Sequence, residues 1–279
     1  MLAFIVRRLA WGFFIVAGVI IITFFAVEAA PGDPFARLES PKMTKDALDA
    51  IKKKWGYDKK PLERFGIYVK RLVTEGDLGD SIAQNRPVSH ILKDALPNTL
   101  KLTLAALALQ LILGIFIGVV QAFKQHSRTD RVLTFGSLFL YSMPGFWLAL
   151  MLALVFAVKL GWLPRHGIHS PGESGFVDYL KHLVMPAFTL GIAAAAYTAR
   201  FQRSALLEVI RQDYIRTARA KGLSENRVIW KHAMKNALLP TITLQGLYLP
   251  FLVSGAIITE SIFAWPGMGQ ATIKAILDR

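Results

Sequence analysis

Five long stretches of the chain hold almost no charged residues, and they limit the folds it can adopt more than any other feature. They span about residues 9–30, 100–123, 132–160, 183–199 and 237–262. A helix needs about 20 mostly apolar residues to cross a bilayer. Lipid offers no water to the backbone polar groups, so helices are the natural structure for such stretches. The sequence therefore predicts an all-α integral membrane protein, a polytopic bundle of transmembrane helices with five spans.

The first stretch also has features of a cleaved signal peptide. Arg7 and Arg8 precede it, and small residues end it in the sequence AVEAA. A signal peptide has an apolar core of roughly 7–15 residues, whereas a membrane crossing needs about 20. The first stretch is long enough for the crossing, so a transmembrane helix is favoured over a signal peptide.

The chain carries a formal net charge of +14, which raises the question of a nucleic-acid partner. Its basic residues, however, lie in the loops between apolar stretches, and no RNA- or DNA-binding motif is present. In a membrane protein this distribution sets the topology and attracts anionic lipid headgroups. Membrane lipid is therefore an expected partner, and nucleic acid is not.

The short loops indicate the direction of the spans. Lys and Arg are abundant between the second and third stretches and between the fourth and fifth. Short loops of this kind face the cytoplasm, so the N-terminus is expected there too.

Residues 31–98 form the one long connection between predicted spans. This segment mixes acidic and basic residues, and connections longer than about 60 residues are translocated largely regardless of charge. We expect a helical extracytoplasmic insertion here, between the first span (1–30) and the transmembrane core (99–279). Its predicted elements are a helix from a Thr44 cap to about Trp55, a helix from Pro61 through Val73, and an amphipathic piece at 88–96.

Three residues, Met143, Pro144 and Gly145, interrupt the third stretch. Lipid tolerates a broken helix only where protein or a water-filled cavity satisfies the freed backbone groups. This break and the polar Gln245 of the fifth stretch are therefore the candidates for lining a translocation pathway.

Small residues predict close helix packing at Gly114, Gly118 and residues 193–196.

The apolar stretches hold few ionisable residues, and those few, such as Glu28 and Glu260, lie near span ends. An ion-coupled carrier needs ionisable groups at membrane depth, so this composition disfavours a secondary carrier.

No catalytic motif accompanies the spans. The sequence contains no HExxH, no GxSxG and no Walker A sequence, and it has no cysteine. His166 and His169, with His182 further along, are the closest approach to a metal signature, and two loop histidines are more typical of a surface loop. We therefore expect no catalytic residue, no metal site and no cofactor bound by this chain, and the energy for any transport has to come from elsewhere.

A polar, basic stretch lies between the last two spans and reads YIRTARAKGLSENRVIWKHAMKNALLP over residues 214–240. Its pattern predicts a helix from 213 to 221 that stops at Gly222, and a second helix with Ser224 as N-cap and Glu225 in its first turn. In the second helix one predicted face holds Val228, Ile229, His232, Ala233, Asn236 and Ala237, and the other holds Arg227, Lys231, Met234 and Lys235. The pattern alone fits both a docking site for a partner protein and a helix lying on lipid headgroups.

The combination of TARAKG with NALLP resembles the cytoplasmic EAA loop of permease subunits in bacterial ABC importers, and specifically the dipeptide, oligopeptide and nickel permease branch. The general pattern has a glutamate six residues before the glycine, where this chain has Arg216, and this departure fits the peptide branch. Further matching pieces are Pro31-Gly32-Asp33-Pro34, Asp77-Leu78-Gly79, Leu96-Pro97-Asn98-Thr99-Leu100, Ser142-Met143-Pro144, Leu163-Pro164, His182 with Pro186, and ESIFAWPGMG at 260–269.

This resemblance implies a transport subunit of the bacterial inner membrane, not an enzyme. In the family, the loop (here 200–237) docks into a groove on a separate ATP-hydrolysing subunit, with ATP and Mg on that partner. The implied partners are a second homologous permease, two such ATPase subunits and an external peptide-binding protein, with peptides as cargo. The docking residues carried over are Arg216, Ala218, Arg219, Ala220, Lys221, Gly222, Leu223 and Ser224, with Ala218, Ala220 and Gly222 nearest the partner and with Arg219 and Lys221 reaching its charges.

Alternatives remain at this point. Relatives in the branch also carry nickel chelates or other small solutes, and an ATP-independent channel or secondary carrier is the alternative from another class. The family has a sixth span, which this sequence lacks, and a truncated C-terminal part is the expected reason.

Overall fold

The computed structural model describes residues 1–32, 35, 50–53 and 56–278, without the side chains of 248–249 and 251–255. The chain divides into two compact units, Met1–Leu92 with Ala275–Arg279, and Lys93–Lys274. Most of the helix predicted from Thr44 to Trp55 lies outside the described residues. Within that range the structure describes only residues 50–53, which are helical.

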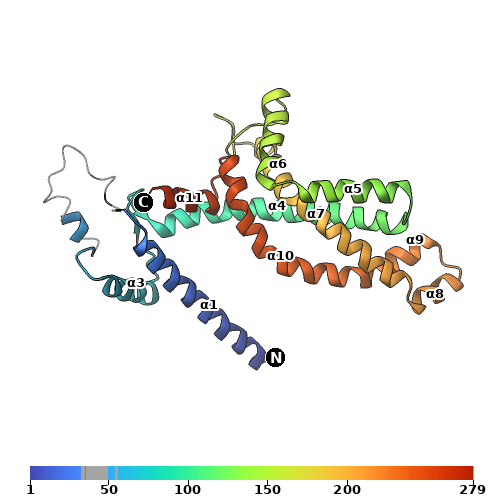
Figure 1. Ribbon diagram of the computed structural model, residues 1–279, viewed down its shortest axis with the longest axis horizontal. Coiled ribbons are helices and arrows are strands. Elements are labelled where there is room, and N and C mark those ends of the chain that lie inside the picture. The colour runs from blue at the N-terminus through green and yellow to red at the C-terminus, as the bar shows by residue number, and fades with distance from the viewer. Residues whose placement is uncertain (33–34, 36–49, 54–55, 279) are drawn as a thin grey trace. The chain divides into compact units, whose positions relative to one another are not determined.

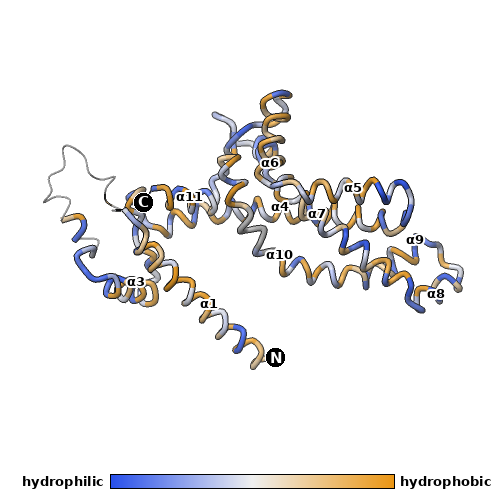
Figure 2. The backbone as a smooth tube through the Cα atoms, in the orientation of Figure 1, coloured by the Kyte–Doolittle hydropathy of each residue, from blue (hydrophilic) through white to orange (hydrophobic). Residues whose placement is uncertain are grey.

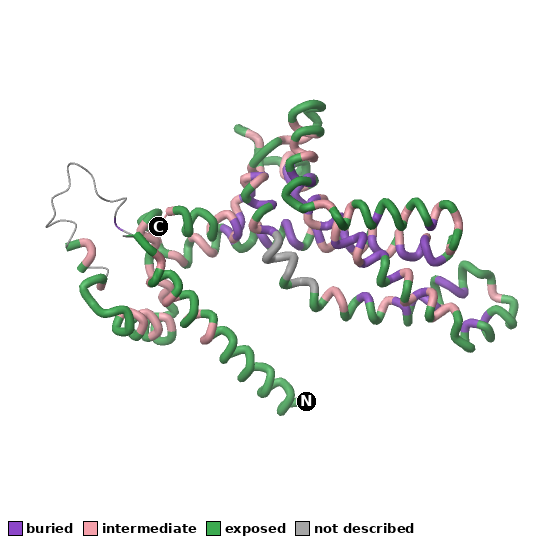
Figure 3. Tube along the Cα trace, viewed as in Figure 1, coloured by how far each residue is buried: buried purple, intermediate pink, exposed green. Residues whose placement is uncertain are grey.

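The first unit contains the helix α1 (Leu2–Ala29), which fits a membrane crossing by length and composition. At about 1.5 Å per residue its 28 residues exceed the roughly 30 Å of a hydrocarbon core. None of its residues is buried, and it is mostly green with some pink turns in Figure 3 and mostly orange in Figure 2. An apolar helix that stays so largely exposed needs lipid or another protein around it.

The helix α3 (Pro61–Glu75) packs on the second half of α1. Pro61 begins α3 as predicted, and Gly76 ends it with φ 64°. Phe65 lies with its ring centroid 5.1 Å from that of Phe24, and Arg64 forms an ion pair with Glu28. Aromatic contacts and the ion pair therefore join the two helices.

Two short strands, which the sequence did not predict, follow α3. β1 (Asp80–Ser81) and β2 (Arg86–Pro87) pair antiparallel, with Asp80 opposite Pro87. The amphipathic piece predicted at 88–96 is also different, because it forms the first turns of the long helix α4 (Val88–Phe123).

The second unit contains the remaining helices (Figure 1). They are most of α4, then α5 (Arg128–Ser142), α6 (Gly145–Leu152), the π-helix η2 (Ala153–Lys159), α7 (Phe176–Ile210), α8 (Asp213–Ala220), α9 (Glu225–Arg227), the π-helix η3 (Val228–Ala233), α10 (Met234–Ile262) and most of α11 (Met268–Leu277).

Three described helices, α1, α4 and α7, are long and apolar enough to cross a membrane, and a bent pair gives a fourth span if it counts as one. That pair is α5 with α6 and η2, which meet at 101°. The third stretch, 132–160, is therefore interrupted where the sequence predicted a break. The fifth predicted span lies within α10, and the count of five stays a prediction. The fourth is longer than predicted, because α7 begins at Phe176 and continues through Pro186.

Close packing of α4 on α7 confirms the prediction from the small residues. A Cβ at Gly114 would lie 2.6 Å from Thr198 Cβ, and a Cβ at Gly118 would lie 2.6 Å from the carbonyl oxygen of Ala199. Ala194, Ala195 and Ala196 of α7 are buried. Glycine thus lets the two helix backbones approach closely.

Candidate functional site

The basic segment, defined here as residues 213–227, contains α8, a turn and α9. Asp213 lies in the first turn of α8, where a carboxylate favours a helix N-terminus. α8 ends at Ala220, and Gly222 follows with φ 75°, a conformation that glycine adopts without the cost borne by other residues. The predicted stop at Gly222 is therefore confirmed.

The second half of the segment begins at the predicted place. Ser224 is the N-cap residue of α9, although its side chain makes no capping hydrogen bond, and Glu225 lies in the first turn. Arg219 connects the two halves, because its Nε and Nη2 donate to the Glu225 carboxylate at 3.0 and 2.6 Å. These hydrogen bonds lower the pKa of the Glu225 carboxyl below its usual value. Arg219 was expected to reach a partner's charges, but within this chain its guanidinium is bound to Glu225.

One side of the basic segment is buried against the rest of the unit. Ile215 and Ala218 of α8 belong to an apolar cluster with the ends of three longer helices. We call this the anchoring cluster, and its buried members are Val119, Ala122, Leu206, Ile215, Ala218, Val228, Ile229, Ala233, Met234 and Ala237.

Ala218 lies on the inner side of the basic segment. Only 6% of this residue is exposed, so its methyl group faces the anchoring cluster and not a partner's surface. Other docking candidates are exposed: Arg216, Arg219, Ala220, Lys221, Gly222 and Ser224, while Leu223 is half-buried. The outward surface of the segment therefore carries basic side chains, and the exposed residues at its turn include the small residues Ala220, Gly222 and Ser224.

A π-helix changes which residues of the predicted second helix are buried. Val228, Ile229 and Ala233 are buried as expected, but Met234 is buried too, and Asn236 is exposed. η3 replaces regular α-helix over residues 228–233, and its i→i+5 bonding shifts the following residues around the axis. The placement of Met234 on the polar face was therefore wrong.

The break at Met143, Pro144 and Gly145 is where the sequence predicted it. α5 ends at Ser142 and α6 begins at Gly145, with Met143 and Pro144 extended between them. Pro144 and Gly145 are exposed, and a Cβ at Gly145 would meet no atom within 4 Å.

Gln245 belongs to a polar group that the sequence did not reveal. Gln110 Nε2 of α4 donates to Gln245 Oε1 of α10 at 2.7 Å and to Thr198 Oγ1 of α7 at 3.0 Å. Gln245 Nε2 also donates to Thr198 Oγ1 at 3.2 Å. Gln110 and Thr198 are fully buried, and Gln245 is half-buried. Two amide side chains and one hydroxyl thus meet among apolar helices. In the sequence, the only sign of this group is that each residue is polar within an apolar stretch.

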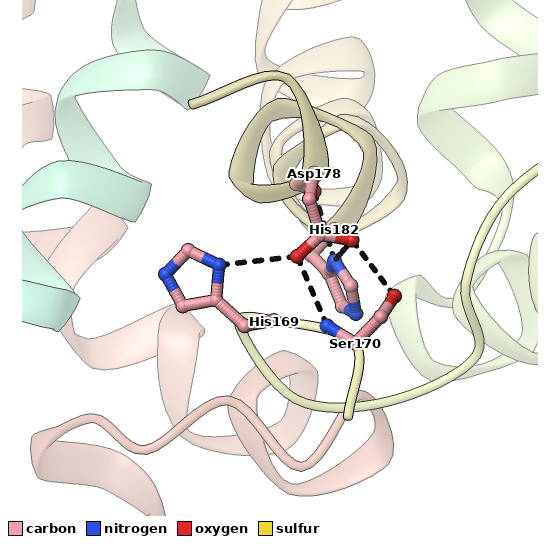
Figure 4. Close-up of polar contacts among 4 residues, drawn as sticks. All are labelled: His169, Ser170, Asp178 and His182. Carbon is pink, nitrogen blue, oxygen red and sulfur yellow. Dashed lines mark hydrogen bonds and ion pairs between the residues drawn. The ribbon is translucent and has the colours of Figure 1, made fainter. Parts of the chain in front are cut away.

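Two of the three histidines, His169 of the loop and His182 of α7, lie beside the Asp178 carboxylate (Figure 4). Asp178 accepts from the backbone N–H and the hydroxyl of Ser170 at 2.9 and 2.7 Å, and His169 Nδ1 lies 3.1 Å from it. His182 Nδ1 lies 2.9 Å from the carbonyl oxygen of Asp178. The described residues contain no cluster of three or more potential metal ligands. Asp178 orders this loop at the start of α7.

A buried carboxylate joins two motifs that lie far apart in the sequence. Glu260 is fully buried and accepts from Thr99 Oγ1 at 2.6 Å and from the backbone N–H of Gln270 at 3.0 Å. Next to it, Trp265 Nε1 donates to the carbonyl oxygen of Asn98 at 3.0 Å. The ESIFAWPGMG and LPNTL sequences therefore pack together and are joined by these hydrogen bonds.

Comparisons with known proteins agree on the class. Residues 110–279 match the family of the binding-protein-dependent transport system inner membrane component, and residues 1–103 match its N-terminal family. The chain is 39% identical over 281 residues to the oligopeptide transport system permease protein AppB of Bacillus subtilis, covering 100% of this chain and 89% of that protein. It is 39% identical to the dipeptide transport system permease protein DppB of Alkalihalophilus pseudofirmus, with 99% and 88% covered.

Solved structures share the fold. An inward-facing structure of the MetNI methionine ABC transporter matches with a TM-score of 0.54 at 20% identity, covering 67% of this chain and 81% of that one. The architecture is thus that of an ABC importer permease. The chain belongs to the family of binding-protein-dependent transport system inner membrane components, and it is an integral membrane transport subunit.

Proposed function

We propose that this chain forms one transmembrane half of an ATP-driven importer for di- or oligopeptides that an external binding protein delivers. The observation that carries the proposal is the basic segment, which is exposed around Gly222 and held from behind by the anchoring cluster. A firmly held, outward-facing turn with small residues suits a partner that approaches its backbone closely.

The partners of the proposed complex are a second homologous permease and two ATPase subunits. ATP and Mg would bind the ATPase subunits, so this chain would bind no cofactor and perform no hydrolysis. The exposed residues Arg216, Ala220, Lys221, Gly222 and Ser224 would contact an ATPase subunit. Ala218 would hold the segment from within.

The topology follows from this docking. The basic segment and the N-terminus lie in the cytoplasm, and the insertion at 31–98 lies on the opposite side, close to the binding protein. The three long described helices and the bent pair support a polytopic bundle.

The cargo proposal is supported by relatives named for oligopeptide and dipeptide transport at 39% identity, and by one named for glutathione transport in Escherichia coli at 34%. A peptide presents backbone amides, which pair with amide side chains. Gln245 and the Met143–Gly145 break are the proposed pathway residues. Gln245 is half-buried beside Gln110 and Thr198, and the break exposes Pro144 and Gly145.

The test is uptake by the complex purified in mild detergent from its native membrane and reconstituted in vesicles. With the binding protein outside and ATP at the ATPase face, we expect labelled dipeptide or pentapeptide to accumulate, and no accumulation without ATP. Glutathione and a nickel chelate serve as competing cargos. Uptake driven by an ion gradient without ATP would contradict the proposal, and preference for the nickel chelate would contradict the peptide assignment.

A further inference from the structure

An ion pair fastens α5 to α7 near the anchoring cluster. Asp130, in the first turn of α5, is 5% exposed and accepts from Arg203 Nη2 of α7 at 2.9 Å. Its Oδ2 also accepts from the backbone N–H of His126 at 3.0 Å. Ser127 caps the same turn, because its hydroxyl accepts from the backbone N–H of Asp130 at 3.2 Å. The carboxylate is therefore held in one position from two sides.

Arg203 lies where α7 packs closely against α4. A Cβ at Gly118 would lie 3.1 Å from the backbone nitrogen of Arg203, so α4 and α7 touch at this residue. One turn further along α7, Leu206 is fully buried in the anchoring cluster together with Ile215 and Ala218 of the basic segment. Arg203 is thus connected to the basic segment through one turn of α7 and the anchoring cluster.

α5 has little apolar attachment of its own. Its only buried residues are Asp130 and Ser137, whereas Val132, Phe135 and Phe139 are between 64% and 71% exposed. Besides the ion pair, Gln121 Nε2 of α4 donates to Thr134 Oγ1 at 3.1 Å. Polar contacts thus hold the first turns of α5, and near its other end Tyr141 stacks on Tyr197 of α7 with ring centroids 6.4 Å apart. Beyond Tyr141, α5 leads into the 101° bend.

We propose that Asp130 and Arg203 are positioning residues that transmit the movement of the basic segment to α5 and to the Met143–Gly145 bend. A charge-assisted hydrogen bond is stronger than a neutral one, and opening this pair leaves the buried Asp130 carboxylate without its charged partner, although the Arg203 side chain is 30% exposed. The pair therefore stays closed when α7 moves, and α5 follows. This inference rests on the proposed function, because it assumes that ATP-driven movement arrives at the basic segment.

The experiment compares variants of the purified complex in vesicles. In Arg203→Gln and Asp130→Asn we expect assembly with the ATPase subunits and ATP hydrolysis to stay within about two-fold of the wild type, while peptide taken up per ATP falls about ten-fold or more. Arg203→Lys keeps the charge and should retain most of the coupling. Arg131→Gln is the matched control, because Arg131 is exposed and is the next residue after Asp130, which forms the ion pair. We expect this control to behave as the wild type does.

A labelling measurement follows α5 directly. The chain has no cysteine, so Ser142→Cys places a single thiol in it, at the end of α5. We expect its reaction rate with a membrane-impermeant thiol reagent to change on ATP binding in the Ser142→Cys chain, and to stay unchanged when Arg203→Gln is added.

The outcomes separate this inference from the proposed function. If the wild type shows no ATP-driven uptake, the proposed function fails. If it does, and Arg203→Gln transports as much peptide per ATP as the wild type, the transmission role is overturned. A loss of uptake and hydrolysis in equal proportion to a loss of assembled complex also overturns it, because the pair would then only stabilise the fold.

Discussion

Replacing Gly222 by valine should lower both the co-purification of ATPase subunits and ATP-driven uptake by about ten-fold or more. Gly222 has φ 75°, and an L-residue pays roughly 1–2 kcal/mol in this region, with β-branched residues among the worst. A Cβ at Gly222 would meet no atom within 4 Å, so the cost lies in the backbone alone. The turn is therefore expected to change shape and misplace the exposed docking residues.

The matched control is Gly222→Asn. Asparagine adopts the left-handed conformation more readily than most residues, so this variant adds a side chain while the turn is kept. We expect it to retain most of the binding and uptake. Equal losses in both variants would show that the side chain itself blocks docking, and unchanged binding in Gly222→Val would exclude a role for the turn geometry.

Replacing Gly118 by valine should strongly destabilise the chain. A Cβ there would lie 2.6 Å from the carbonyl oxygen of Ala199 and 2.8 Å from Gln202 Cβ, so the α7 backbone has to move. Overpacking costs typically about 1–3 kcal/mol, and contact with backbone leaves little room to relax. We expect a lower midpoint of thermal unfolding in detergent and a smaller fraction of monodisperse protein.

The control for that variant is Gly136→Val in α5. Gly136 is exposed, and its Cβ would meet no atom within 4 Å. The same substitution therefore adds the same side chain without a clash, and the midpoint should change little. Equal loss in both variants would mean that helix propensity, and not the contact of α4 with α7, determines the effect.

Local sequence signals predicted the elements that local chemistry determines. Pro144 marks a helix break, because its ring removes a donor and restricts the preceding residue. Gly222 marks the end of a helix, and the structure has both features where the sequence placed them. Neither signal carries the size of a bend, so the 101° between α5 and α6 was not foreseen.

Side-chain direction in short or irregular helices was harder to predict. α8 has only eight residues, and its neighbours decide which of its faces is buried. Ala218 and Ala220 look equivalent in the sequence, yet Ala218 contacts the anchoring cluster and Ala220 is exposed. Met234 was misplaced because regular 3.6-residue periodicity does not hold through the π-helix η3.

Contacts across long sequence separations were invisible beforehand. Thr99 and Glu260 are 161 residues apart, and Gln110 and Gln245 are 135 apart. The sequence shows each as a polar residue in or near an apolar stretch. Only the packing of α4 and α7 with α10 brings the three glutamine and threonine side chains together.

The most direct measurement is site-specific cross-linking from the basic segment in the native membrane. A single cysteine at Ala220→Cys, carrying a photo-activated cross-linker, faces outward, whereas Ala218→Cys faces the anchoring cluster and is the matched control. We expect Ala220→Cys to yield a covalent adduct with an ATPase subunit, identified by mass spectrometry, and Ala218→Cys to yield none. Adducts with lipid alone at Ala220 would contradict docking and indicate that the basic segment lies on the membrane surface.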